Sequence, residues 1–499
     1  MQRKLTLAIR RAAIAVALWS AGMGSVALGQ SYYVAPSPAP ADLGYYPTGV
    51  GQMESINPIA GNLALSFPLA QLPPGPGGFS TGVRLLYNSA YYTSGTTFNG
   101  STVTIHYENY PPDVDFGGPQ FDGGWRYGFR YAVWSASEPA GVSPGKTTYL
   151  TTADGAHHVL LLAGTLNTSG TAGPPPSAFN NNYPNQPIYE VDFRGWCTSG
   201  TSACISGKFS GTLIFATADG TQIRVEVDTV NKLWSASFPD GTVVSGNYDP
   251  AGSNMGEIAA AEWNQIHDKN GNTISLTNFC YEGDTCTTAL TDQQGRAINI
   301  RYGTQNNWPF TWTDTITQPG VNGTLSTIVN WASYDFTRPT YECSYNVSSQ
   351  TFGTCDATGT FSDPFVVTSI QLPQANSGGA STVYQFAYDS PPSSVNWGLL
   401  HSMSQRTLAS GSDLTPCANN VESACPKRYQ IDYQYSFDNP STHRVMGTLV
   451  NPVSSRTLTY AGGPVNGEVT SYSIPVPLTF DPQNPPAGGG TSTITNPDN

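Results

Sequence analysis

The stretch Ile266-His-Asp-Lys-Asn-Gly-Asn-Thr-Ile-Ser-Leu-Thr-Asn278 returns 24 residues later as Leu290-Thr-Asp-Gln-Gln-Gly-Arg-Ala-Ile-Asn-Ile-Arg-Tyr302. Asp268 corresponds to Asp292 and Gly271 to Gly295, and alternating apolar residues follow each glycine. Such alternation around a turn signal predicts a β-hairpin. Because a repeat at fixed spacing shows how a chain is built, the sequence predicts stacked antiparallel β-hairpins.

Asp-Gly pairs extend this series toward the N-terminus. Each pair precedes alternating strand residues, and we expect type I′ hairpin turns, in which both central residues have positive φ. The complete set of predicted repeat-turn residues is Asp154, Gly155, Asp219, Gly220, Asp240, Gly241, Asp268, Gly271, Asp292 and Gly295, with Arg296 and Tyr302 completing the last unit.

The composition also favours an all-β protein. Charged residues make up 11% of the 499 residues, and the chain has 52 glycines and 39 prolines. Low charge with many turn-forming residues is typical of many short strands. Because disordered chains have few aromatic residues and a high charge density, the 27 Tyr, 20 Phe and 10 Trp argue against global disorder.

Residues 1–29 read as a secretory signal peptide, although an uncleaved anchor is the alternative. A basic start precedes an apolar stretch at 12–23, which is short for a membrane span, and small residues precede the expected cleavage after Gly29. These residues carry four positive charges and no acid, so cleavage changes the formal charge from −13 to −17. We expect a secreted chain that contacts no membrane after cleavage and binds no nucleic acid, because its charge repels phosphate.

The eight cysteines fall into four near pairs: Cys197/Cys204, Cys280/Cys286, Cys343/Cys355 and Cys417/Cys425. Disulfides persist in exported proteins, and the spacing does not suit a zinc site. The sequence does not fix the connectivity. We expect nearest-neighbour pairing, with each bridge closing a short loop and contributing about 2–3 kcal/mol.

Composition shifts divide the chain into expected regions. An extended lead-in at 30–52 precedes an N-terminal β region at 53–165 and a Pro/Asn-rich loop at 166–189. The Asp-Gly hairpin repeats occupy 190–303, and a further β region with degenerate repeats occupies 304–460. We expect the Pro/Gly/Thr-rich tail at 461–499 to be disordered.

Candidate catalytic and metal-binding groups are sparse. The i, i+2 carboxylate pairs would face one side of a strand, as acid/base chemistry requires, but such pairs are common on solvated strands. These pairs are Asp113/Asp115, Glu190/Asp192 and Glu226/Asp228. His157 and His158 would point to opposite faces of a strand, which favours a role at a hairpin edge.

Asp268, Asn270 and Asn272 resemble part of a calcium loop, but Phe279 stands where the last ligand would be. Nucleophile-elbow and phosphate-loop motifs are absent from the sequence. The sequence therefore predicts no catalytic residue, no metal and no cofactor.

The phrase Thr291-Asp-Gln-Gln-Gly-Arg296 with Tyr302 resembles the unit of the Rhs/YD-repeat family. The start of the chain resembles the N-terminal region of the same proteins, in Asn57-Pro-Ile-Ala-Gly-Asn-Leu63, Pro68-Leu69, Leu72-Pro73, Gly77-Gly78, Leu86-Tyr-Asn-Ser89 and Gly124-Trp125. The resemblance covers most of residues 53–303 and, weakly, 383–460.

This resemblance implies a hollow β shell or a surface filament. Many members end in a toxin held inside the shell, next to a Gly/Asn/Tyr-rich block with an aspartyl self-cleavage site. Since no such block occurs here, we expect the front part of a larger protein. The expected function is a secreted, non-enzymatic structural or surface-interaction module, whose partner is another protein, the cell surface or a downstream toxin domain.

Two alternatives remain open at this stage. A carbohydrate-binding or adhesion protein of β-sandwich type would use exposed tryptophans and bind polysaccharide. The candidates are Trp125, Trp134, Trp196, Trp234 and Trp263. A secreted hydrolase would use Glu190 and Asp192.

Overall fold

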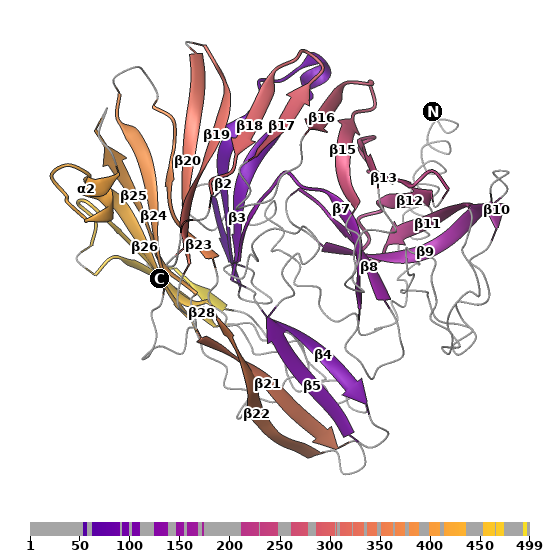
Figure 1. The fold of residues 1–499 in the computed structure, drawn as a ribbon. Helices are drawn as coiled ribbons and strands as arrows, with labels where there is room; N and C mark the ends of the chain where they lie inside the picture. Colours follow the sequence, from indigo (N-terminus) through magenta and orange to yellow (C-terminus); the bar gives the residue numbers. More distant parts are fainter. Residues whose placement is uncertain are drawn as a thin grey trace, which may run out of the picture. The chain divides into compact units, whose positions relative to one another are not determined.

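The computed structural model describes residues 53–56, 62–89, 92–98, 102–109, 124–137, 146–153, 157–167, 172–173, 211–228, 230–247, 261–277, 286–304, 306, 310–321, 323–333, 337–346, 351–362, 365–374, 379–388, 399–409, 414–435, 453–464, 466–473 and 493–496. Within these residues the chain is almost entirely β, so the all-β prediction is confirmed (Figure 1). The described helical segments are the short α2 (Thr415–Ala418) and η2 (Pro76–Gly78). No helix in the described ranges is long and apolar enough to cross a membrane.

Most strands belong to one large antiparallel sheet. Its strands are β7 (Ala132–Ser137), β8 (Lys146–Thr151), β9 (His157–Asn167), β10 (Ala172–Gly173), β11 (Gly211–Thr217), β12 (Arg224–Asp228), β13 (Leu233–Ser237), β14 (Val243–Asn247), β15 (Ala261–His267), β16 (Thr273–Thr277), β17 (Thr287–Asp292), β18 (Ala297–Arg301), β19 (Thr311–Gly320), β20 (Gly323–Ser333), β23 (Phe365–Gln371), β24 (Ser381–Tyr388), β25 (Leu400–Leu408), β26 (Lys427–Tyr435), β27 (Val453–Tyr460), β28 (Glu468–Ser473) and β29 (Thr493–Thr495). Neighbours in the sheet are mostly neighbours in sequence, as stacked antiparallel hairpins require.

The sheet branches at β15. The N-terminal end of β15 pairs with β7, through Ala261 opposite Val133, whereas its C-terminal end pairs with β16, through Ile266 opposite Ile274. The other edge of β15 pairs with β14. Strands β7–β9 and β11–β15 therefore form a closed ring, and the rest of the sheet continues from β16 to β29.

Two smaller sheets complete the described structure. The first, which we call the inner sheet, contains β1 (Glu54–Ile56), β2 (Leu63–Gln71), β3 (Gly82–Asn88) and β6 (Trp125–Tyr127). The second contains β4 (Tyr92–Phe98), β5 (Thr102–Asn109), β21 (Thr337–Asn346) and β22 (Thr351–Ser362), in the order β22-β21-β5-β4.

These pairings correct the regions expected from sequence. Residues 53–165 are not one β region, because they supply strands to all three sheets, and β9 continues to Asn167. The pairing of β5 with β21 joins segments that are far apart in sequence, so no local pattern predicts it. The expected disordered tail includes β28 and β29, which pair with each other. Residues 1–29 and 30–52 lie outside the described ranges.

Alternation of burial along each strand produces the core. In β11 the pattern is strict: Leu213 and Phe215 are buried, and the residues between them are partly exposed. The buried faces of the inner sheet and of the large sheet form one continuous hydrophobic cluster. The inner sheet thus covers the face of the large sheet that would otherwise be exposed, and β2 and β3 lie against β17–β20 in Figure 1.

Candidate interaction surface

The predicted repeat turns lie along one edge of the large sheet. Strands β11, β13, β15 and β17 run in the same direction because two antiparallel pairings separate each from the next. The turns after these strands, which contain Asp219, Asp240, Asp268 and Asp292, therefore share an edge, and we call them the turn row. Asp154 and Gly155 lie outside the described residues.

The expectation of type I′ turns is wrong. The turn glycines have positive φ, with +89° at Gly241 and +76° at Gly295, but none of the turn aspartates does. Phe238 and Thr242 close a loop in which Gly241 N donates to Phe238 O at 3.0 Å, and Asp292 and Gly295 make the equivalent bond at 2.9 Å. Such three-residue loops need a left-handed residue at their last position alone, which glycine provides.

The two Asp-x-x-Gly turns have the same internal bonds. Asp268 Oδ1 accepts from the backbone N–H of Asn270 at 2.8 Å and of Asn272 at 2.9 Å. Asp292 Oδ1 accepts in the same way from Gln294 at 2.9 Å and from Arg296 at 3.0 Å. The second oxygen of each carboxylate is also used inside the turn, because Asp268 Oδ2 accepts from Asn272 Nδ2 and Asp292 Oδ2 accepts from Arg296 Nε.

These bonds also set the ionisation of the turn carboxylates. Desolvation raises the pKa of Asp268 and Asp292, but the hydrogen bonds from the residues four and two positions later outweigh it. The pKa of each carboxyl is therefore below its ordinary value, and the ionised form stabilises the turn.

Neighbouring turns are in contact with each other. A Cβ placed on Gly241 would lie 2.9 Å from the Cβ of Lys269 in the next turn. Gln293 Nε2 donates to Asn272 Oδ1 at 2.8 Å, and Gln293 N donates to Thr273 O at 3.1 Å. The turns around Asp268 and Asp292 therefore form one continuous surface.

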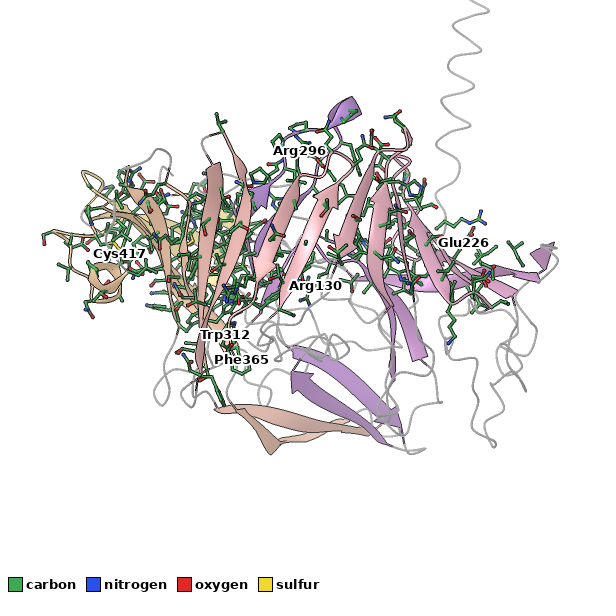
Figure 2. All side chains as sticks on the ribbon, turned by 45° about the horizontal axis from the view of Figure 1, so that its top comes forward. Arg130, Glu226, Arg296, Trp312, Phe365 and Cys417 are labelled. Atoms are coloured by element: carbon green, nitrogen blue, oxygen red, sulfur yellow. A yellow bond between two sulfur atoms is a disulfide. The ribbon has the colours of Figure 1, made fainter. Side chains whose placement is uncertain are left out.

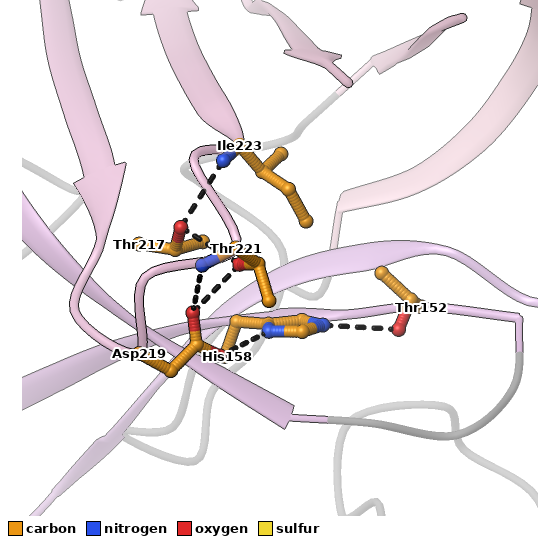
Figure 3. Close-up of polar contacts among 6 residues, drawn as sticks. All are labelled: Thr152, His158, Thr217, Asp219, Thr221 and Ile223. Carbon is orange, nitrogen blue, oxygen red and sulfur yellow. Dashed lines mark hydrogen bonds and ion pairs between the residues drawn. The ribbon is translucent and has the colours of Figure 1, made fainter. Parts of the chain in front are cut away.

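His158 joins the Asp219 turn to β9 (Figure 3). Its Nδ1 lies 2.5 Å from Asp219 Oδ2, and its Nε2 lies 3.3 Å from Thr152 Oγ1. This order of hydroxyl, imidazole and carboxylate resembles that of a hydrolase triad, but His158 is 8% and Thr152 7% exposed. A substrate would not reach the hydroxyl, so the contact serves the hairpin edge.

The Asp219 carboxylate is strongly stabilised in its ionised form. Partial burial raises its pKa, but hydrogen bonds from His158 and Thr221, together with the His158 charge, outweigh this and hold the pKa of Asp219 well below its usual range. Thr221 donates to Asp219 Oδ1 through both its backbone N and its Oγ1. His157 contributes a backbone pairing with Thr151.

The face of the large sheet beneath the inner sheet is lined with aromatic residues. Phe67 of β2 packs against Tyr384 and Phe386 at ring-centroid distances of 5.0 and 5.4 Å, and Trp125 packs against Phe386 at 4.8 Å. Trp125 Nε1 also donates to Tyr388 Oη at 2.7 Å. These pairs fix the inner sheet on β24 by geometry as well as by apolar burial.

Tyr302, the last residue of the repeat phrase, belongs to this interface. It is 1% exposed and its ring contacts Tyr127 of β6 edge-on at 6.0 Å. Arg296, by contrast, lies at the hairpin tip in the turn row (Figure 2). In this repeat unit, Tyr302 therefore contacts the inner sheet, whereas Arg296 lies at the edge of the large sheet.

Two buried carboxylates, those of Asp314 and Glu54, were not predicted from the sequence. Asp314 of β19 is 0% exposed and accepts hydrogen bonds from Tyr127 Oη at 2.7 Å, Trp331 Nε1 at 2.8 Å and Gly303 N at 3.0 Å. Glu54 Oε1 of β1 accepts from Arg456 Nε of β27 at 2.8 Å. No local signal marks either group, because their partners lie on distant segments.

The Glu54–Arg456 pair is surrounded by tyrosines. Burial, followed by the charge of Glu54, raises the pKa of Tyr472 to about 12. The same two causes raise the pKa of Tyr433 well above its ordinary value. The side chains of Glu54 and Arg456 are themselves only 2% and 7% exposed, so the pair lies in a poorly solvated part of the interface between the inner sheet and β26–β28.

Among the described cysteines, one predicted near-neighbour pair is bridged. Cys417 and Cys425 form a disulfide across eight positions. Cys343 lies opposite Cys355 in the β21–β22 register, and Cys286 is disulfide-bonded. Cys197, Cys204 and Cys280 lie outside the described residues.

The alternative sites receive little support from the described residues. Trp125, Trp234 and Trp263 are 0–2% exposed, so they are core residues and not a sugar-stacking platform. Trp196 and the side chain of Trp134 lie outside the described parts of the chain.

The carboxylates of Glu226 and Asp228 line a groove of about 290 Å³ on the outer face of β12–β14. Glu226 pairs with Arg224 at 2.6 Å, and Asp228 caps the following turn by accepting from Val230 N at 2.9 Å. Both carboxylates are therefore engaged by their own strand and turn. Asp113, Asp115, Glu190 and Asp192 lie outside the described residues.

Comparisons with known proteins give distant structural similarity but no match in sequence. No protein-family model and no curated protein matches the sequence. A solved structure of the Photorhabdus luminescens Tc holotoxin pore, carrying a point mutation, aligns with a TM-score of 0.29 and 12% sequence identity. The alignment covers 86% of this chain and 18% of that chain. At this level of similarity, the resemblance to YD-repeat proteins stays a prediction.

Proposed function

We propose that this chain is a secreted, non-enzymatic structural module of YD-repeat type, forming the front part of a larger β shell that encloses or presents a partner or toxin. The observation that carries the proposal is the large sheet of successive antiparallel strands, part of which closes into a ring at β15. The inner sheet covers the aromatic face of this large sheet. Stacked repeats that bury each other's faces build walls and not catalytic pockets.

The chemistry of the described residues supports a structural role. The Asp268 and Asp292 carboxylates accept hydrogen bonds within their own turns. Glu226 forms an ion pair with Arg224, and Asp228 accepts a hydrogen bond from the turn that follows it. The Thr152 hydroxyl and the His158 imidazole are buried. A structural module needs such internally satisfied polar groups, because they fix a single arrangement of the strands.

The far edge of the sheet supports a larger assembly. Among the described strands, β29 ends the sheet and pairs through one edge with β28. Ile494 of β29 is 39% exposed, and Val469 of β28 is 41% exposed. In the part of the chain that the structure describes, the other edge of β29 has no partner strand, and a strand edge with apolar neighbours favours pairing with further strands.

The test sequences the gene beyond codon 499. The chain from residue 30 is then expressed alone and together with any segment that the same reading frame encodes after residue 499. The proposal expects the longer product to form a hollow particle by electron microscopy and to protect its C-terminal part from added protease. A continuing segment that is cut at the same rate with and without this chain would contradict enclosure. Saturable binding to a polysaccharide by the chain alone would favour the adhesion alternative.

A further inference from the structure

Two turns of the turn row hold the backbone of a distant proline-rich segment. Arg296 Nη2 donates to Pro73 O at 2.7 Å, and Asn272 Nδ2 donates to Pro76 O at 2.9 Å. Arg296 and Asn272 have equivalent positions in their repeats, directly after the left-handed Gly295 and Gly271. The repeated sequence therefore presents a repeated hydrogen-bond donor.

The turn aspartate orients each donor from behind. Asp292 Oδ2 accepts from Arg296 Nε at 2.7 Å, and Asp268 Oδ2 accepts from Asn272 Nδ2 at 2.7 Å. Charge-assisted hydrogen bonds are short and directional. The bonds to the aspartates therefore hold Arg296 Nη2 toward Pro73 O and the second N–H of Asn272 Nδ2 toward Pro76 O. The contact between Gln293 and Asn272 keeps the two donors at a fixed separation.

The separation of the two turns matches the period of an extended proline-rich chain. Neighbouring hairpin tips are two strands apart, or about 9.6 Å at about 4.8 Å per strand. A polyproline II helix has three residues per turn and advances about 3.1 Å per residue, so carbonyls i and i+3 face one side about 9.3 Å apart. Pro73 and Pro76 are three residues apart in sequence, and Gly75 between them is extended, with φ −84° and ψ −167°, before Pro76 begins the 3₁₀ turn η2.

The segment lies on the surface and is anchored at both ends. Pro73, Pro74 and Pro76 are exposed, whereas Leu72 is 1% exposed and Phe79 packs against the core. Figure 2 shows Arg296 beside the indigo coil of η2, at the tips of the hairpins. Proline suits the position because it has no N–H to leave unpaired and its φ is already fixed.

We propose that the turns 268–272 and 292–296 are a recognition site for an extended proline-rich segment, and that residues 73–76 are its resident occupant. The site reads two backbone carbonyls three residues apart. It holds the start of the inner sheet's β2–β3 connection on the edge of the large sheet. The proposal concerns contacts within this chain and stands independently of whether a larger shell forms.

The first experiment frees the site and adds its occupant in trans. A variant with residues 73–78 replaced by a six-residue Ser-Gly linker is titrated with a fluorescein-labelled peptide of residues 70–80, followed by anisotropy. We expect saturable binding to the linker variant and at least about tenfold weaker binding to the unmodified chain, whose site is occupied. Adding Arg296→Ala to the linker variant should weaken binding by about tenfold, as expected for loss of a charge-assisted bond.

Gln294→Ala in the same linker variant is the matched control, because Gln294 is an exposed residue of the same turn. Its peptide affinity should not change. Equal binding by the Arg296→Ala and Gln294→Ala versions would overturn the proposal. So would a folded linker variant that does not bind the peptide.

A second measurement covers a linker variant that does not fold. Hydrogen–deuterium exchange is compared between the unmodified chain, Arg296→Ala and Gln294→Ala at the amides of Leu72, Gly75 and Gly78, all of which make backbone hydrogen bonds in the segment. We expect exchange to become several-fold faster in Arg296→Ala alone. Unchanged exchange in that variant would show that the turns do not hold the segment.

Discussion

Replacing Arg456 with methionine tests whether the inner sheet depends on its buried ion pair. The side chains of Glu54 and Arg456 are 2% and 7% exposed, and they join β1 to β27 across 402 positions. Arg456→Met would leave the Glu54 carboxylate buried without its cation. Removing one partner of a buried pair typically costs about 3–5 kcal/mol, and we expect a loss in this range.

The assay is equilibrium urea unfolding, followed by the fluorescence of the buried tryptophans, Trp125 among them. The matched variant is Glu54→Leu/Arg456→Met, which removes both charges. It should recover most of the loss, because replacing a whole buried pair with apolar residues is often neutral or stabilising. A double variant no more stable than Arg456→Met, or a single variant that loses less than about 1 kcal/mol, would refute the assignment of a desolvated pair.

Three further outcomes follow from the turns and the disulfide. Gly295→Ala, at a φ of +76°, should destabilise the chain by about 1–2 kcal/mol in thermal or urea unfolding, because alanine is strained in the left-handed region. Ala297→Gly in the adjoining strand is the comparison, because it alters a neighbouring residue without placing a side chain at a left-handed position. Cys417→Ser/Cys425→Ser should cost about 2–3 kcal/mol for its short loop, with no change in the far-ultraviolet strand signal. Asp219, Asp268 and Asp292 have folded pKa values below the ordinary 3.8, so their contribution to stability is fully present above that value and is lost as the pH falls below about 4. The melting temperature measured between pH 6 and pH 2 should therefore drop in acid, and Asp219→Asn should lessen the drop.

The hairpins could be predicted from the sequence because their determinants are local. Asp268 and Gly271 lie within one loop, and the strands that they join are adjacent. Alternation then fixes which residues face the core, as in the buried Ile298 and Ile300 of β18. A reader of the sequence needs no knowledge of the rest of the chain for these assignments.

The inner sheet and its contacts could not be predicted, because they depend on partners far apart in sequence. Tyr127 and Asp314 are 187 positions apart, and nothing near either residue indicates the other. The same applies to the tryptophans. Alternation places Trp125 and Trp234 on one face of a strand, but whether that face is exposed depends on what covers it, which here is another sheet.

The two kinds of turn in the row explain why the arginine of the repeat phrase matters. In the Asp-Gly turns, Asp240 and Asp219 bond the residue two positions later, Thr242 and Thr221. In the Asp-x-x-Gly turns the aspartate lies two positions earlier relative to the glycine, and its carboxylate also accepts from the backbone N–H of the residue four positions later. In these turns the same carboxylate orients the side chain of Arg296 or Asn272, which donates to the 73–76 segment. The spacing of aspartate to glycine therefore separates turns that close a hairpin from turns that also hold another segment, and this distinction can be read directly from sequence.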